Sequence, residues 1–374
     1  MTIQSKTLKI TAVEAFQIDY KLVDLKYSWS NDLYITTVTS TIVRVSTDEG
    51  VVGYGEVCPL GSAYMDAFAR GVPAGIAEVG PAVVGMDPLQ LNLLNERMDL
   101  ALGGHAYVKS PIDIACWDIL GKVSGQPVAT LLGGRYRDWI PPYRAIPQRS
   151  PKEMAEDVLK YRSMGYRRFQ LKVGGDANED IARIKECRAA LEPSDILVAD
   201  ANTGWLPHEA LRVVNAVRDI DVYIEQPCAT MEECLVVRRN TTLPFVLDEV
   251  IRGVEPLVEA FKNGAMDVVN LKISRLGGLT RAKTVRDLCQ NMGIAMTLED
   301  SWGGDITTAA ITHFAGSTRS EFYLSSTDFN SYVDVRLAED APRMKDGKLP
   351  IPTGPGLGIT VDEKALGEAV VRVA

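Results

Sequence analysis

The chain has 374 residues, and 46% of them are hydrophobic, which suffices for two domains with sizeable cores. Its net charge of −9 and its acidic isoelectric point argue against nucleic acid and anionic membranes as partners. No apolar run reaches the roughly 18 residues of a membrane span, and no signal-peptide core follows Met1. The six cysteines are scattered without a CxxC pair, so we expect a cytoplasmic protein without a disulfide framework or a zinc site.

The first part of the chain has the pattern of strands followed by helices. Three segments alternate polar and apolar side chains as strands do, namely residues 8–18, 40–50 and 51–57. The sequence DEG between the last two predicts a turn and therefore a meander. Helical periodicity follows in Asp66–Val84, Pro88–Leu102 and Ser110–Val123. We expect an α+β domain over residues 1–135.

Strand-like and helix-like segments then alternate to about residue 340. The first predicted strand is 141–146, and later ones are 294–299 and 321–326. The predicted helices are Pro151–Met164, Asn178–Leu191, Pro207–Arg218, Met231–Arg239, Glu255–Asn263, Leu279–Met292 and Gly304–Ala315. Eight strands and at least seven helices predict a β/α barrel over residues 136–340. The tail, residues 341–374, is rich in Gly and Pro, and we expect it to return to the first domain.

Charged residues close five successive strand-like runs of this second part. They are Lys172, Asp200, Glu225, Asp248 and Lys272. The steps between them are 28, 25, 23 and 24 residues (200 − 172, 225 − 200, 248 − 225 and 272 − 248), and a step of about 25 residues suits one strand plus one helix. Because the carboxyl ends of barrel strands converge on one rim, we expect three carboxylates to meet with a lysine on either side.

The carboxylates of Asp200, Glu225 and Asp248 are hard oxygen ligands, which suit magnesium, with manganese as a substitute, better than zinc. The alternative is three solvated or salt-bridged acids, but three consecutive strand ends on the barrel rhythm favour the metal. Asn202 lies two residues after the first ligand, and Glu249 directly follows the last. Both are placed to orient ligands or a lysine.

The two lysines, Lys172 and Lys272, flank this predicted metal site. A lysine acts as a base when burial and a nearby cation lower its pKa. The alternative is that each lysine lies at the surface or pairs with the acids. Their positions on the second and sixth strands place them on opposite sides of a barrel, which favours a catalytic role.

These segments resemble the enolase superfamily, and within it the muconate lactonizing enzyme subgroup. The motifs that carry the resemblance extend over nearly the whole chain: STDEGVVGYGEV, SPIDIACWDILGK, VADANTGW, IEQPC, LDEV, LKISRLGGLTRA and EDSWGGD. The resemblance implies a capping domain on a modified (β/α)7β barrel. It also implies one magnesium ion held by the three carboxylates, and the two lysines as acid and base around an enediolate intermediate. One departure is Gln170, which stands where the subgroup usually has a lysine.

A base on each face predicts racemisation or epimerisation, whereas a base and an acid together allow elimination or cycloisomerisation. None of the three histidines ends a strand, which argues against the His-Asp dyad of sugar-acid dehydratases. Trp302 and Asp300 follow the seventh strand and are placed to bind a substrate ammonium. Four aromatic residues of the first domain are candidates for a lid, namely Tyr27, Trp29, Tyr54 and Tyr64.

The leading interpretation is a racemase or epimerase of a proline-like amino acid or betaine, because EVCPLGSAY and EDSWGGD resemble enzymes that act on proline betaine and hydroxyprolines. The alternatives on the same scaffold are a 3-hydroxyproline dehydratase, an acylamino acid racemase and a muconate-type cycloisomerase. A non-enzymatic protein that retains the fold is a further alternative. The expected partner is a small carboxylate substrate, and we expect a homo-oligomer.

Overall fold

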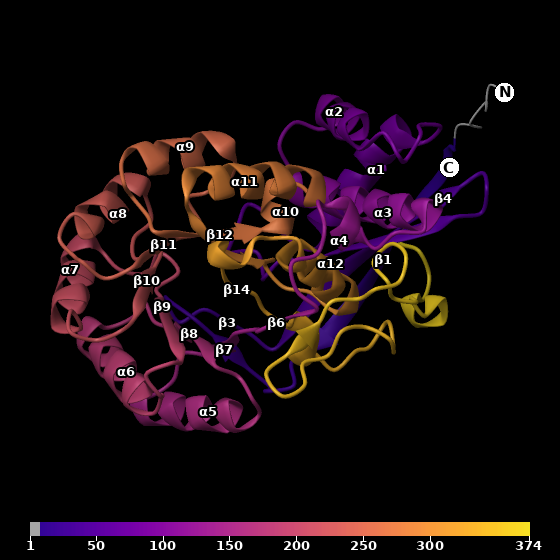
Figure 1. The fold of residues 1–374 in the computed structure, drawn as a ribbon. Coiled ribbons are helices and arrows are strands. Elements are labelled where there is room, and N and C mark those ends of the chain that lie inside the picture. The colour runs from indigo at the N-terminus through magenta and orange to yellow at the C-terminus, as the bar shows by residue number, and fades with distance from the viewer. Residues whose placement is uncertain (1–7) are drawn as a thin grey trace.

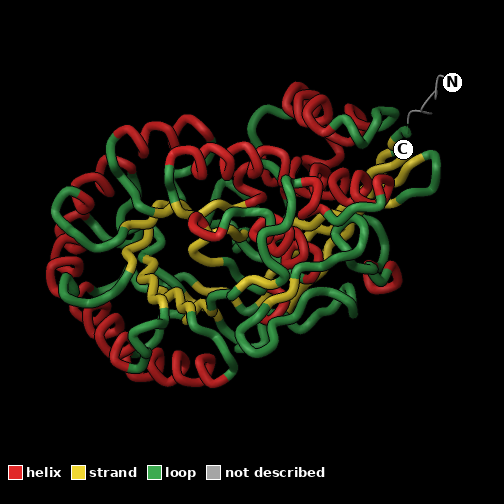
Figure 2. Tube along the Cα trace, in the orientation of Figure 1, coloured by secondary structure: helices red, strands yellow, loops and turns green. Residues whose placement is uncertain are grey.

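The computed structural model describes residues 8–374, which form an antiparallel sheet region and a barrel (Figure 1). The ring of strands in the barrel has its helices on the outside, and the sheet region lies beside it with the described N-terminal end and the C-terminus close together (Figure 2). Within residues 8–374, no helix is long and apolar enough to cross a bilayer.

The first region contains a four-stranded antiparallel sheet in the order β16-β1-β4-β5. Its strands are β1 (Ile10–Lys21), β4 (Thr37–Thr47), β5 (Val52–Val57) and β16 (Val371–Val373). The pairing of β4 with β5 confirms the predicted hairpin, and β16, near the end of the tail, pairs with β1. A small hairpin of β2 (Tyr27–Ser28) and β3 (Tyr34–Ile35) was not predicted.

Helices α1 (Gly71–Val83), α2 (Leu91–Ala101), α3 (Ala106–Ser124) and α4 (Val128–Leu131) follow. The prediction that the first of them starts at Asp66 was wrong. Pro73 lies in the first turn of the helix, where its missing N–H leaves no hydrogen bond unmade, and this favours a start near Gly71. Helix α3 packs closely on β5 because that strand has Gly53 and Gly55. A Cβ on Gly55 would lie 1.9 Å from the carbonyl oxygen of Pro111.

The second region is an eight-stranded sheet in sequence order, with every pairing between neighbours parallel. The strands are β7 (Arg144–Ile146), β8 (Arg168–Lys172), β9 (Ile196–Asp200), β10 (Tyr223–Glu225), β11 (Phe245–Leu247), β12 (Val268–Lys272), β13 (Ala295–Glu299) and β14 (Tyr323–Ser325). The ends of the sheet meet where the Tyr143 amide donates to the Ser326 carbonyl at 2.7 Å. The predicted barrel is confirmed.

Helices lie between the strands, with bounds within a few residues of those predicted. They are α5 (Pro151–Ser163), α6 (Ala177–Ala189), α7 (Pro207–Ala216), α8 (Met231–Arg238), α9 (Val254–Lys262), α10 (Ile273–Leu276), α11 (Leu279–Met292) and α12 (Asp305–Gly316). The short α10 was not predicted. The remaining elements are the pair β6 (Trp139–Ile140) and β15 (Leu349–Pro350), and three 3₁₀ turns at Ser320–Phe322, Phe329–Ser331 and Glu363–Leu366.

The two regions are joined by a buried carboxylate on β5. Glu56 accepts hydrogen bonds from the backbone amides of Gly304 and Thr307, both at 2.8 Å, at the start of α12. A carboxylate at a helix N-terminus satisfies amides that have no partner within the helix. This contact ties the first sheet to the helix that follows the seventh barrel strand. The domain boundaries at residues 135 and 340 stay predictions.

Candidate active site

The five charged residues predicted at strand ends lie together at one end of the barrel. Four of them are the last residues of their strands, and Asp248 directly follows β11. Lys172 pairs in register with Asp200, and Asp200 with Glu225, so neighbouring strands present these side chains side by side. The exposed fractions of Asp200, Glu225 and Asp248 are only 1%, 2% and 0%, and both lysines are buried as well. The site is therefore a dense cluster of charges shielded from bulk solvent.

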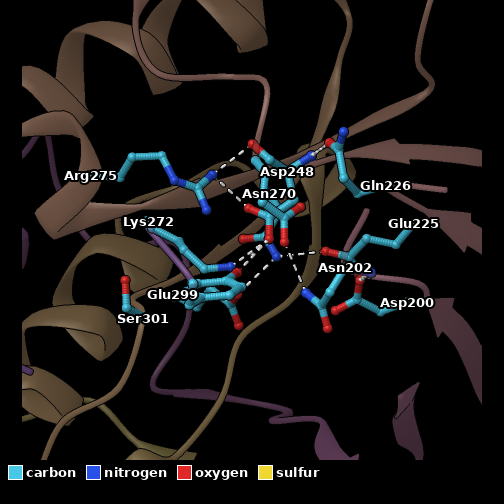
Figure 3. A network of polar contacts seen from close by, with 12 residues as sticks. Asp200, Asn202, Glu225, Gln226, Asp248, Asn270, Lys272, Arg275, Glu299 and Ser301 are labelled. Atoms are coloured by element: carbon cyan, nitrogen blue, oxygen red, sulfur yellow. Dashed lines mark hydrogen bonds and ion pairs between the residues drawn. The ribbon is translucent and has the colours of Figure 1, made fainter. Parts of the chain in front are cut away.

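Cationic side chains pair with two of the three carboxylates. Lys172 Nζ lies 2.5 Å from Asp200 Oδ2, and Lys272 Nζ lies 2.6 Å from Asp248 Oδ2. Arg275 Nη1 donates to Asp248 Oδ1 and to its backbone oxygen, both at 2.6 Å (Figure 3). Charge-assisted bonds of this kind offset part of the cost of burying the charges.

The pKa values follow from burial and from these pairs. Burial, and then the neighbouring Asp200 and Asp248, raise the pKa of Glu225 well above its usual value. Burial would also raise the pKa of Asp248, but Arg275 and Lys272 outweigh it and lower that pKa. Burial alone would lower the pKa of Lys272, yet the carboxylates beside it raise it. Lys272 is therefore charged in this arrangement, and work as a base requires Asp248, the carboxylate that most raises its pKa, to be drawn away.

The three carboxylates are suited to a hard divalent cation by chemistry and by burial. In this structure, however, their oxygens are not arranged around a single metal position. Within residues 8–374, no group of three or more His, Cys, Asp or Glu side chains is arranged to hold a metal ion. The physical reason is that Lys172, Lys272 and Arg275 occupy oxygens of Asp200 and Asp248. The remaining repulsion between the carboxylates favours a divalent cation in place of the ammonium groups.

Neutral side chains support this cluster. Glu225 accepts from Gln170 Nε2 at 2.9 Å and from Asn270 Nδ2 at 2.8 Å. Gln170, which departs from the subgroup's lysine, thus contacts a candidate ligand as an amide. Asn202 Nδ2 donates to Glu249 Oε1 at 2.9 Å, and the orienting role of both residues stays a prediction. Burial and then Asp248 raise the pKa of Glu249 to about 7.

The backbone is strained within two residues after two of the candidate ligands. Asn202, two residues after Asp200, has φ 42°, and Gln226, directly after Glu225, has φ 35°. Residues other than glycine rarely adopt such φ values. These conformations persist only where the surrounding structure stabilises them. The turn lets the Gln226 side chain reach back and accept from the Asp248 amide at 2.8 Å. Strain at the site therefore helps to align neighbouring strand ends.

Sequence reasoning missed three residues of this cluster, namely Asn270, Arg275 and Glu299. Glu299 closes β13 and contacts Lys272, so the strand-end rule could have found it. Asn270 lies two residues before Lys272 on the same strand and therefore on the same face, as Gln170 does before Lys172. Arg275 lies in the unpredicted α10, and no sequence pattern signals its contact with Asp248.

A cavity of about 20 Å³ lies beside the two lysines, and it is smaller than a cyclic amino acid. Its lining includes the predicted Trp29, Asp300 and Trp302. The Trp302 ring packs against Tyr27, Phe329 and Tyr332, with centroids 5.0, 5.3 and 5.5 Å away. Asp300 accepts from the Ser274 amide and hydroxyl, and burial raises its pKa to about 6. Its oxygens are thus already engaged within the protein.

One predicted substrate contact lies elsewhere. The Tyr54 hydroxyl donates to Glu363 at 2.5 Å, and Tyr54 is not among the residues that line the cavity beside the lysines. The prediction that Tyr54 lines a lid over the site was wrong, because the returning tail takes its hydroxyl. Tyr64 does reach the site, since its hydroxyl donates to Asp248 Oδ2 at 3.1 Å. It also borders a larger cavity of about 500 Å³.

Comparison with known proteins identifies the family of the chain. Residues 153–365 match the family model described as enolase C-terminal domain-like, and residues 32–133 match the mandelate racemase/muconate lactonizing enzyme N-terminal domain. The chain is 56% identical to a cis-3-hydroxy-L-proline dehydratase of Roseibium aggregatum, over 98% of this chain and all of that protein. It is 28% identical to an N-succinyl-L-Arg/Lys racemase of Bacillus cereus, over 97% of this chain and 98% of that protein.

A solved structure gives the same result for the fold. The crystal structure of an enolase superfamily member from Roseovarius nubinhibens, complexed with magnesium, superposes with a TM-score of 0.93 at 38% identity and covers 98% of this chain and all of that one. The chain therefore belongs to the mandelate racemase/muconate lactonizing enzyme family and is an enzyme of the enolase superfamily.

Proposed function

We propose that the protein is a dehydratase of a cis-3-hydroxyproline. The observation that carries this proposal is the pair of buried lysines on either side of three buried carboxylates. It is supported by 56% identity to a cis-3-hydroxy-L-proline dehydratase over nearly the whole chain. The sequence alone favoured epimerisation, and this similarity moves the leading reaction to elimination.

The placement of the lysines suits the cis isomer. Lys172 ends β8 and Lys272 ends β12, four strands apart in an eight-stranded ring, so they face each other across the barrel. In a cis-3-hydroxyproline the hydroxyl lies on the same ring face as the carboxylate and therefore opposite the α-hydrogen. A base on one face and an acid on the other thus serve the elimination without any turn of the substrate.

The proton transfers follow from this placement. One lysine, neutral at that moment, removes the proton from Cα. The electron pair of that C–H bond forms the C2–C3 double bond as the C3–O bond breaks. The other lysine, as ammonium, donates its proton to the departing hydroxyl, so that one water and one unsaturated proline result. Each turnover leaves the first lysine protonated and the second neutral, and exchange with solvent resets both.

Asp200, Glu225 and Asp248 would hold the divalent cation, magnesium first and manganese as a substitute. When bound, such a cation neutralises the negative charge that develops next to the substrate carboxylate. The structure complexed with magnesium, 38% identical to this chain, supports the choice of metal. Drawing Asp200 from Lys172 and Asp248 from Lys272 also removes, for each lysine, the charge that most raises its pKa.

Epimerisation of a proline-like amino acid or betaine is the second candidate. The same two lysines would serve it, one removing the α-proton and the other returning a proton to the opposite face. The aromatic lining of the cavity around Trp302 favours a cationic nitrogen, as in a betaine. The similarity to a racemase over 97% of the chain supports it too.

The test is turnover of the four stereoisomers of 3-hydroxyproline with magnesium, followed by proton NMR, together with polarimetry on proline betaine. We expect loss of water from a cis isomer and at least about tenfold slower loss from a trans isomer, whose hydroxyl and α-hydrogen share a face. Optical inversion without loss of water would replace the dehydratase by the epimerase. Neither reaction, and no exchange of the α-proton in D₂O, would contradict both.

A further inference from the structure

We propose that Glu299 is a positioning residue that holds the ammonium group of Lys272 and makes the two lysines unequal. The inference rests on the proton transfers proposed above. Glu299 ends β13, and its Cα pairs in register with that of Lys272 at the end of β12. Adjacent parallel strands therefore bring both side chains to the same rim of the barrel.

Three donors fix the carboxylate of Glu299, which is 2% exposed. Oε1 accepts from Lys272 Nζ at 2.9 Å and from Asn270 Nδ2 at 2.8 Å. Oε2 accepts from the Tyr143 hydroxyl. Both oxygens are engaged from two sides of the carboxylate, so it has little freedom to rotate. It forms a fixed anchor for the lysine, as Figure 3 shows for Lys272, Asn270 and Glu299.

Lys172 has no such anchor. Within residues 8–374 its one ion pair is with Asp200, at 2.5 Å. Asp200 and Asp248 belong to the three carboxylates proposed to take a divalent cation, whereas Glu299 does not. When those two turn to the cation, Lys272 keeps Glu299, and Lys172 keeps no carboxylate partner among the described residues. The position of Lys272 thus depends on Glu299, and that of Lys172 does not.

The consequence is a difference between the two faces of the substrate. Proton transfer requires donor and acceptor to be aligned, and a displacement of about 1 Å can cost about 100-fold in rate. Loss of Glu299 should therefore impair transfer on the face that Lys272 serves and spare the other face. A residue that only supports the fold would impair both faces alike.

The experiment measures each face separately. L-proline and D-proline carry the α-hydrogen on opposite faces and have no hydroxyl to lose, so exchange of their α-proton in D₂O reports one lysine each. Lys272→Ala, loaded with magnesium, first identifies the enantiomer that depends on Lys272. Glu299→Gln should then slow that exchange by about 100-fold and the exchange of the other enantiomer by less than about threefold. Magnesium affinity by calorimetry should stay within about twofold.

Two further variants keep the test decisive. Glu299→Asp retains the negative charge on a shorter side chain. It should slow exchange of the same enantiomer, but by a smaller factor, and it replaces the Gln variant if that variant fails to fold. Ser325→Ala is the control, because Ser325 is buried on the neighbouring strand β14 and its hydroxyl has no hydrogen-bond partner among the described residues, and both exchanges should stay within about twofold of wild type.

The outcomes are separable from those of the proposed function. Equal losses for both enantiomers, or a fall in magnesium affinity large enough to explain the loss, would overturn the positioning role while the proton transfers stand. No exchange of either enantiomer by the wild-type protein would contradict the proton transfers themselves, and this inference would fall with them.

Discussion

Buried carboxylates occur in two parts of this molecule, and they differ in what holds them. Glu56, between the first sheet and the barrel, accepts from four neutral donors, which are the hydroxyls of Tyr20 and Ser40 and the amides of Gly304 and Thr307. Burial raises the pKa of Glu56, and these hydrogen bonds oppose it. Two of the four donors are backbone amides at the start of α12, which cannot move away without local unfolding, so the contact serves to join two regions.

The carboxylates of Asp200, Glu225 and Asp248 lie at the end of the barrel where its strands end, which we call the mouth. They have movable and charged partners instead. Asp200 and Asp248 pair with the side chains of Lys172, Lys272 and Arg275, and they repel Glu225. Such partners can exchange for a cation or transfer a proton. Burial of a charge alone therefore does not mark a candidate functional site, whereas burial with replaceable, mutually repelling partners does.

The strongest way to test this comparison is Asp248→Asn. The change removes one charge from the mouth but keeps the size of the side chain, so we expect a loss of turnover of about 1,000-fold or more, or about 4 kcal/mol, with the fold retained. Turnover and magnesium affinity measure the effect, and circular dichroism checks the fold. Normal turnover by this variant after chelation would contradict the metal assignment.

The corresponding change in the other region is Glu56→Ala. Four buried donors would lose their acceptor, and we expect the free energy of unfolding to fall by about 3 kcal/mol. Magnesium affinity should remain that of wild type, since Glu56 does not contact the mouth. Denaturant unfolding and calorimetry give the two quantities. A variant of wild-type stability with weakened magnesium binding would reverse the roles assigned to the two regions.

Trp302→Leu tests the aromatic wall of the cavity. A cation over an indole face contributes roughly 0.5–2 kcal/mol, so binding of a betaine or proline-like acid should weaken by about tenfold. Binding by calorimetry should be compared with that of a carboxylic acid of similar shape and without a charged nitrogen, which should lose little. Equal losses would leave Trp302 as a packing residue.

The smallest expected effect concerns His313, a buried neutral group far from the mouth. Its Nδ1 accepts from the Ala129 amide, and its Nε2 donates to the Leu357 carbonyl. Burial lowers its pKa to about 4 from the usual 6.5. The unfolded chain thus binds the proton first, and stability is lost as pH falls from 6.5 towards 4, by about 1 kcal/mol between pH 7 and pH 5.5.

Unfolding free energies at these two pH values check this expectation. His313→Gln should reduce the difference in unfolding free energy between pH 7 and pH 5.5 by about 1 kcal/mol. His208→Gln, at an exposed histidine of α7, serves as the matched control and should keep the wild-type difference. An unchanged pH difference in the His313 variant would show that the carboxylates alone account for it.

The sequence by itself determined the barrel and the strand-end residues at its mouth. The reason is local: parallel strands of similar length end on one rim, so the spacing of Asp200, Glu225 and Asp248 is enough to bring them together. The same spacing of strand ends predicts the flanking lysines, and it could also have predicted Glu299. The meander of β4 and β5 likewise follows from alternation and a turn.

Only the tertiary structure decided contacts between segments far apart in the chain. Tyr54 turns to Glu363, which lies 309 residues later, and Arg275 reaches Asp248 from a helix too short to leave a periodic pattern. Glu56 contacts the start of α12 because the first sheet packs against the barrel region there. Side-chain alternation predicts which face a residue occupies, but it carries no information on what will cover that face, and that depends on packing.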